Sequence, residues 1–280
     1  MKQSEHDIQK ILDLKQELDG KNIVGLTIAR GGSRRLPRKN VLSFCGRPLV
    51  AWALLQMKYS ILITHPYLST DDDEIAGIGE EYGIPVIRRP DFGHDATAAV
   101  AYEHALKNMD HSVDLFVPML PTCPIRHPYD IDESIRLFYD MNRKESAMEI
   151  ITIVPEMERT VYERIDKNKY RGIFSSKNWK YAAGQGTWQV IILERFYENQ
   201  RKLISKKDSE LDEIPSHLSN PDSGFHYSYE CEIYQQFDID LLEHLELNEL
   251  MMKYHILKND DNPYEKYWIN AMEILKIGEK

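Results

Sequence analysis

The chain has 280 residues, of which 42% are hydrophobic and 29% charged, as is ordinary for a soluble globular protein with a sizeable core. Its formal net charge of −10 argues against a general nucleic-acid binder, which would carry an overall basic face. Three widely spaced cysteines, Cys45, Cys123 and Cys231, indicate reduced thiols rather than a disulfide framework or a zinc site. No stretch approaches the ~18 apolar residues of a membrane span, and the N-terminus has no continuous apolar segment. We therefore expect a cytoplasmic protein without a membrane partner.

Helix-like and strand-like segments alternate along the first half of the chain. Residues 4–19 carry apolar side chains at helical spacing and predict a leading N-terminal helix within 1–20. The expected strands that follow are 22–29, 67–70, 84–89, 114–120 and 147–155, and the expected helices between them are 46–60, 71–83, 95–109 and 127–142. Strands that alternate with helices of this length indicate βαβ units, so we predict an α/β fold with a mostly parallel sheet flanked by helices.

The second half of the chain is less regular. Residues 156–187 are polar and rich in aromatic side chains, which favours a β-excursion or an oligomer arm over a separate domain. Beyond them we expect a strand and a helix over 188–204, a mobile polar loop over 205–228, a strand over 229–240 and a helix over 241–257. A last helix over 264–277 completes a division into one domain, 21–258, and a C-terminal segment, 259–280.

A basic segment, "ARGGSRRLPRKN", interrupts this acidic chain directly after the first expected strand. Its cationic side chains are Arg30, Arg34, Arg35, Arg38 and Lys39. Open α/β sheets bind ligands at the carboxyl ends of their strands, which is where this segment falls. Gly31 and Gly32 allow the backbone to approach a ligand, and Ser33 adds a hydroxyl. The segment matches neither the Walker A motif nor the GxGxxG motif. Two interpretations remain open for it: a phosphate-binding site, or a basic turn that is exposed to solvent.

Two groups of aspartates are candidates for metal binding. Asp238 and Asp240 have the i, i+2 spacing that places both carboxylates on one face of a strand, where they could hold Mg²⁺. The alternative is that one of them caps the helix that begins near Leu241, and the residues alone favour that alternative. The run Asp71–Asp72–Asp73 stands at a helix start, where capping is the better interpretation.

The ordered set of motifs resembles the CMP-sialic acid synthetase (acylneuraminate cytidylyltransferase) family. "IARGGSRRLPRKN" is similar to the family signature I-x-A-R-x-G-S-x-x-x-P-x-K-N. Further similar segments follow in the family's order: "FCGRPLVAWAL", "STDDDEIA", "RRPDFGHDATAAVAYEHAL", "LPTCPIR" and "FDIDLLEHLELNELM". The resemblance covers about residues 22–255.

This resemblance implies a Rossmann-like nucleotidyltransferase fold, a homodimer with 156–187 as its dimerisation excursion, and transfer of CMP from CTP to a 2-keto sugar acid with release of pyrophosphate. Arg30 and Lys39 would be catalytic. Asp238 and Asp240 would hold Mg²⁺ as cofactor. Carried over by position, the CTP-binding residues would be Arg30, Gly31, Gly32, Ser33, Arg34, Lys39, Asn40 and Arg89.

The acceptor half departs from the family pattern. Leu120 stands where the family usually has Gln, and Leu cannot donate the hydrogen bonds of an amide. The candidates for binding an anionic acceptor are Leu120, Arg126 and Gln185, with Arg171 as a further basic side chain. The expected acceptor is a nonulosonic acid such as sialic, legionaminic or pseudaminic acid. Another ulosonic acid, a phosphonate, or a catalytically silent nucleotide-binding protein remain alternatives.

Overall fold

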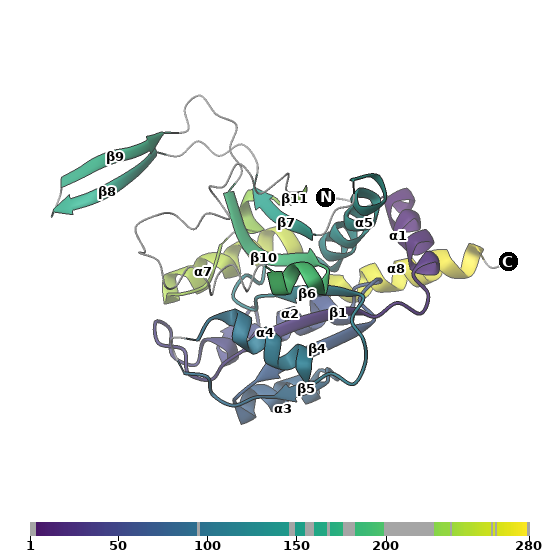
Figure 1. Cartoon of the computed structure of the whole chain (residues 1–280), viewed down its shortest axis with the longest axis horizontal. Coiled ribbons are helices and arrows are strands. Elements are labelled where there is room, and N and C mark those ends of the chain that lie inside the picture. Colours follow the sequence, from purple (N-terminus) through teal and green to yellow (C-terminus); the bar gives the residue numbers. More distant parts are fainter. Residues whose placement is uncertain are drawn as a thin grey trace.

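A seven-stranded sheet forms the centre of the protein in the computed structural model (Figure 1). The structure describes residues 4–93, 96–145, 149–154, 160–166, 169–175, 183–198, 227–235, 237–258, 260 and 262–278, without side chains over 144–187, at 227 and at 277–278. In spatial order the strands are β11 (Tyr227–Glu230), β7 (Glu149–Val154), β10 (Ala183–Ile191), β6 (Leu115–Met119), β1 (Ile23–Ala29), β4 (His65–Thr70) and β5 (Val86–Arg88). Every neighbouring pair is parallel except those of β10, which runs against β6 and β7. The predicted α/β class with a mostly parallel sheet is confirmed.

Helices cover both faces of this sheet (Figure 1). The helices are α1 (Glu5–Glu17), α2 (Leu49–Lys58), α3 (Asp73–Glu81), α4 (Ala98–Lys107), α5 (Pro128–Glu145), α7 (Leu242–Met251) with a π-helical extension (Met252–Leu257), and α8 (Pro263–Gly278), and residues 193–198 are also helical. Strand β1 explains why two layers form, because its successive side chains point to opposite faces. Ile23 and Ala29 join the core shared with α1, α2, α5 and α8, whereas Val24 and Leu26 pack with α4 and 193–198.

The terminal helices pack together on one side of the sheet. Helix α1 contacts both α5 and α8, and α5 contacts α8. Asp132, fully buried on α5, accepts hydrogen bonds from the backbone N–H groups of Ile61 and Leu62 at 2.9 and 3.0 Å. It also accepts one from the Tyr267 hydroxyl of α8 at 2.9 Å. A buried carboxylate needs such donors, and the bond from Tyr267 fastens the C-terminal helix to α5.

The expected strand over 229–240 is wrong beyond its first residues. Strand β11 ends at Glu230, and the chain then turns through a short 3-10 helix, Ile233–Gln235. The Gln235 amide stabilises this turn, because it accepts from the N–H of Glu232 and donates to Asp130 on α5. The segment thereby leaves the sheet edge and runs toward the loop after β6. Most of the expected loop over 205–228 lies outside the described residues, and 227–228 already belong to β11.

The excursion over 156–187 contains a separate β-hairpin. Its strands are β8 (Thr160–Asp166) and β9 (Lys169–Ser175), which pair antiparallel as a two-stranded sheet. The hairpin stands away from the central sheet in Figure 1. Searched over the described part of the chain, no helix is long and apolar enough to cross a membrane.

Candidate active site

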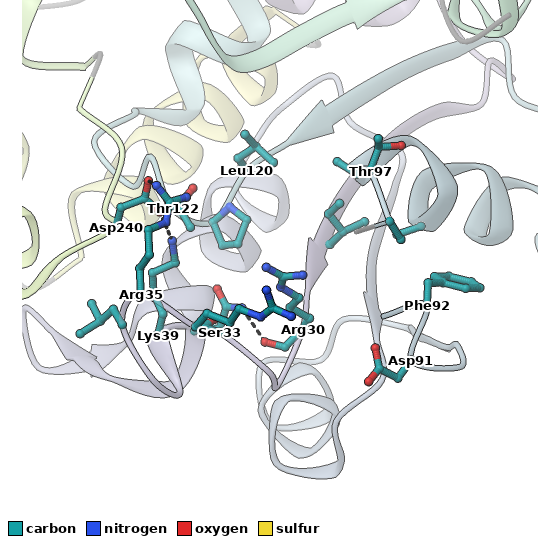
Figure 2. Close-up of a pocket in the computed structure, with 18 of the residues that line it drawn as sticks. Arg30, Ser33, Arg35, Lys39, Asp91, Phe92, Thr97, Leu120, Thr122 and Asp240 are labelled. Atoms are coloured by element: carbon teal, nitrogen blue, oxygen red, sulfur yellow. Dashed lines mark hydrogen bonds and ion pairs between the residues drawn. The ribbon is translucent and has the colours of Figure 1, made fainter. Parts of the chain in front are cut away.

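A cavity of about 510 Å³ opens at the carboxyl edge of β1, β5 and β6 (Figure 2). Its walls come from the loop after β1, the segment after β5, the start of α4, the loop after β6, and the segment before α7. The cationic side chains that line it are Arg30, Arg34, Arg35, Lys39 and Arg89, and the acidic ones are Asp91, Asp238 and Asp240. The cavity therefore concentrates positive charge in a protein that is acidic overall.

Arg38 and Asp72 tie the loop after β1 to helix α3. Arg38 has a left-handed backbone, with φ of 56°, and its guanidinium spans both carboxylate oxygens of Asp72, with Nη2 and Oδ1 3.2 Å apart. Asp72 also caps α3, because its Oδ1 accepts from the N–H of Ile75 at 3.1 Å. The hydrogen bonds from Arg38 hold the pKa of Asp72 below its usual range. The predicted capping role of the aspartate run is confirmed for Asp72.

Gly31 is packed against this pair so closely that a side chain does not fit. A Cβ at Gly31 would lie 2.2 Å from Oδ2 of Asp72 and 3.0 Å from Nη1 of Arg38. For the CTP site that the sequence resemblance implies, Gly31→Ala is expected to displace the pair and to reduce CTP affinity by about tenfold, since the loop then loses its anchor. Gly77→Ala, on the exposed face of α3 with nothing within 4 Å, is the matched control and should bind CTP normally. Equal CTP affinity in both variants, measured by calorimetry, would contradict this role.

Lys39 and Asp240 meet at one side of the cavity (Figure 2). Lys39 Nζ lies 2.9 Å from Oδ1 of Asp240 and also donates to the carbonyl of Ile239. Lys39 is 13% exposed and Asp240 17%, so the contact is largely shielded from solvent. Asn40 is buried, and its amide donates to the Arg30 carbonyl at 3.0 Å, which fixes the exit of β1. Lys39 and Asn40 both belong to the 3-10 turn Lys39–Val41.

Arg89 occupies the side of the cavity next to β5. Its Nη2 lies 3.1 Å from Oδ1 of Asp71, and its guanidinium stands over the ring of Phe92 at 5.6 Å. Burial lowers the pKa of Arg89, and the nearby Asp71 carboxylate acts in the opposite direction. Its Nε is buried without a hydrogen-bond partner in the described part of the protein. A buried N–H group without a protein partner can donate a hydrogen bond to a polar group of a ligand.

Two arginines of the basic segment carry charge that no described residue pairs with. Among the described residues, no hydrogen bond or ion pair engages the guanidinium of Arg30 or Arg34. Ser33 lines the same wall. Unpaired guanidinium groups next to a cavity suit an anionic ligand, because they form bidentate hydrogen bonds with phosphate.

The acceptor-side candidates do not gather in one place. Leu120 and Thr122 line the cavity, but Arg126 does not: it is fully buried, and donates to the Leu120 carbonyl at 2.8 Å and to Gln56 at 2.9 Å. Arg126 thus supports the loop after β6 from behind. Gln185 belongs to β10 and Arg171 to β9, and both side chains fall outside the described ones.

Asp238 and Asp240 lie in the cavity, although the segment that carries them is not a strand. Leu241 is the N-cap of α7 and no side chain caps that helix, so neither aspartate has the capping role. Asp238 makes no ion pair with any described residue, and its Oδ1 accepts a hydrogen bond from the Cys123 thiol, with the sulfur 4.0 Å away. Burial, aided by Asp238, raises the pKa of that thiol to about 12, so it stays protonated.

The two carboxylates fit a magnesium ion that is shared with a ligand. The described residues include no cluster of three or more His, Cys, Asp or Glu side chains that could hold a metal ion. Mg²⁺ commonly takes one or two carboxylates and completes its shell with water and substrate phosphates. A pair of carboxylates beside a basic cavity is that kind of partial donor set.

Some residues that line the cavity were not identified from the sequence. Asp91, Phe92 and Thr97 form the wall opposite the basic segment (Figure 2). Their position after the expected strand 84–89 is the signal that could have found them, because that strand ends at the same edge as β1.

Comparison with known proteins agrees with this arrangement. Residues 24–169 match the family model described as "Cytidylyltransferase", which is more than half of the chain. The chain belongs to the cytidylyltransferase family. It is 26% identical over 159 residues to an N-acylneuraminate cytidylyltransferase of Oncorhynchus mykiss, covering 55% of this chain and 36% of that protein. It is 27% identical over 186 residues to a pseudaminic acid cytidylyltransferase of Campylobacter jejuni, covering 64% of this chain and 79% of that protein.

A solved structure with a related fold is that of a CMP:2-keto-3-deoxy-manno-octonic acid synthetase complexed with CTP. The TM-score is 0.59 at 12% sequence identity, and the alignment covers 85% of this chain and all of the other. At this identity the match establishes the nucleotidyltransferase fold alone. The chain spans about a third of the length of the Oncorhynchus mykiss relative.

Proposed function

We propose that this protein is a CTP-dependent cytidylyltransferase that joins CMP to an acidic sugar and releases pyrophosphate. The observation that carries the proposal is that five cationic side chains, two of them without a partner among the described residues, line one cavity together with the carboxylates of Asp238 and Asp240. Arg30, Arg34 and Lys39 supply positive charge for a triphosphate, while Asp238 and Asp240 stand at the same cavity. This combination suits a nucleotide that is bound together with a divalent cation.

In the proposed reaction a hydroxyl oxygen of the acceptor forms a bond to the α-phosphorus of CTP. The bond from that phosphorus to the oxygen of the β-phosphate breaks, pyrophosphate leaves, and the hydroxyl proton passes to solvent. Negative charge grows on the non-bridging oxygens and on the leaving group. Arg30 and Lys39 are placed to stabilise that charge without covalent chemistry.

We assign the remaining contacts by position in the cavity. Ser33 and the backbone of Gly31 and Gly32 would bind phosphate oxygens, and Asn40 would hold the loop in place. Arg89, whose Nε has no hydrogen-bond partner among the described residues, would face the cytosine ring. When bound, Mg²⁺ would supply Lewis-acid stabilisation of the phosphates, with Asp238 and Asp240 as its protein ligands.

The proposed acceptor is a nonulosonic acid, on the strength of the relatives and the motif pattern. Leu120 makes the wall after β6 less polar than a Gln at that position would. The rival acceptors are another ulosonic acid or a phosphonate.

Pyrophosphate release with CTP and Mg²⁺ tests the proposal against a panel of acceptors. The panel includes sialic, legionaminic and pseudaminic acids, Kdo and simple phosphonates, with ATP, GTP and UTP replacing CTP as controls. Release that requires CTP and one acceptor is the expected result. CTP binding without release across the panel would favour a silent nucleotide-binding protein, and release with other nucleotides alone would contradict the assignment.

We further propose that the protein is a homodimer whose contacts include the β8–β9 hairpin. The support is that the hairpin is a separate two-stranded sheet away from the main body (Figure 1). Light scattering should give about twice the chain mass of 32.8 kDa, and deletion of 160–175 should give a monomer. A monomeric full-length chain would overturn this proposal.

A further inference from the structure

Asp240 has both carboxylate oxygens occupied by cations of the protein itself. Oδ1 lies 2.9 Å from Nζ of Lys39, and Oδ2 lies 2.6 Å from Nη1 of Arg35 (Figure 2). The two cations differ in their surroundings. Lys39 is 13% exposed and is anchored in the 3-10 turn, whereas the Arg35 side chain is 70% exposed and lies on the loop after β1. Of the two contacts, the one to Arg35 therefore costs less free energy to break.

Neighbouring residues lack this double pairing. Asp238 forms no ion pair with any residue that the structure describes, although it lines the same cavity. Arg34 precedes Arg35 on the same loop and also lines the cavity, and within the described chain its guanidinium is unpaired. The contact between Arg35 and Asp240 is therefore a specific pairing and not a general consequence of a basic loop beside an acidic segment.

We propose that Arg35 is a displaceable counter-ion that couples nucleotide binding to divalent-cation binding at Asp240. The inference rests on the proposed function, because it takes the triphosphate as the anion that competes for Arg35. Without nucleotide, Arg35 neutralises Asp240 and disfavours a second cation there. When a triphosphate enters, its oxygens attract Arg35 more strongly than one carboxylate does, and Oδ2 of Asp240 becomes available.

This arrangement has a thermodynamic consequence that can be measured. If nucleotide binding removes Arg35 from Asp240, then removing Arg35 by mutation should strengthen cation binding in the absence of nucleotide. The same mutation should weaken nucleotide binding in the absence of cation, because Arg35 no longer contacts the phosphates. Both effects follow from the loss of one side chain, which contacts Asp240 without nucleotide and the phosphates when nucleotide is bound.

The test measures Mn²⁺ binding to the nucleotide-free full-length protein by electron paramagnetic resonance of free Mn²⁺. Arg35→Ala is expected to bind Mn²⁺ about three- to fivefold more tightly than the unmodified protein, the size expected for a largely exposed ion pair. Arg34→Ala removes the same charge from the same loop and is expected to change the affinity by less than about twofold. With Asp240→Asn as background, Arg35→Ala should have no effect, which isolates the pairwise contact.

A second measurement separates this inference from the proposed function. CTP binding is measured in EDTA by calorimetry, where Arg35→Ala is expected to lose about threefold in affinity. Unmodified protein that fails to bind CTP would defeat the proposed function. Normal CTP binding, with equal Mn²⁺ affinities in Arg35→Ala and Arg34→Ala or no detectable Mn²⁺ binding in either, would overturn the counter-ion role alone.

Discussion

Asp240→Asn is expected to lower Mg²⁺-dependent turnover by at least about a hundredfold while leaving the fold intact. The substitution keeps the shape of the side chain and removes its charge. Asp240 lies in the cavity beside Lys39 and Arg35, the cations proposed to contact the phosphates, so a metal ion held by its carboxylate would stand next to those phosphates. The measurement is pyrophosphate release over a range of Mg²⁺ concentrations, with thermal unfolding followed by circular dichroism to monitor the fold.

Glu243→Gln is the matched control for this variant. Glu243 is an exposed carboxylate in the first turn of α7, three residues after Asp240, and does not line the cavity. Its replacement should leave turnover within about twofold. Turnover in Asp240→Asn that equals that of this control would remove Asp240 as a ligand.

Lys39→Ala is expected to weaken CTP binding by about thirtyfold. A hydrogen bond between an ionised donor and an ionised acceptor contributes about 1.5–3 kcal/mol when it is shielded from solvent, and Lys39 is mostly buried. The loss should appear in EDTA as well as in Mg²⁺, because in the proposed site the ammonium contacts the phosphates directly. Isothermal calorimetry with CTP measures both conditions.

Two further variants test whether the effect is specific to the ammonium group of Lys39. Lys39→Arg retains the charge with a different shape, so an intermediate affinity is expected. Lys58→Ala removes an exposed lysine at the end of α2, whose ammonium donates to the Tyr82 carbonyl away from the cavity, and should bind CTP normally. If Lys39→Ala bound CTP as tightly as Lys58→Ala, the phosphates would have to lie elsewhere.

The position of the site follows from local signals in the sequence. Ile23 to Ala29 form a short β-branched run, and the basic segment comes directly after it. Parallel strands end at one edge, so the loop after β1 and the loop after β6 had to meet there. That rule was enough to bring Arg30 and Leu120 into one cavity.

Contacts between distant segments could not be derived in this way. Arg38 pairs with Asp72 across 34 residues, and Arg35 with Asp240 across some two hundred, so only the folded chain identifies these partners.

Arg126 illustrates the converse error. A basic residue near the end of β6 suggests an anion site, but Gln56 and the Leu120 carbonyl satisfy its guanidinium in the interior. Composition and spacing do not distinguish a buried, satisfied arginine from a ligand-binding one.

The central claim is tested most directly by following the α-phosphorus of CTP. CTP radiolabelled at that atom is incubated with Mg²⁺ and the acceptor that gives the most pyrophosphate, and the products are separated. We expect the label to appear in a CMP-linked acceptor, with label from the γ-position appearing only in pyrophosphate. Label from the α-position in free CMP or CDP, and none attached to the acceptor, would contradict cytidylyl transfer.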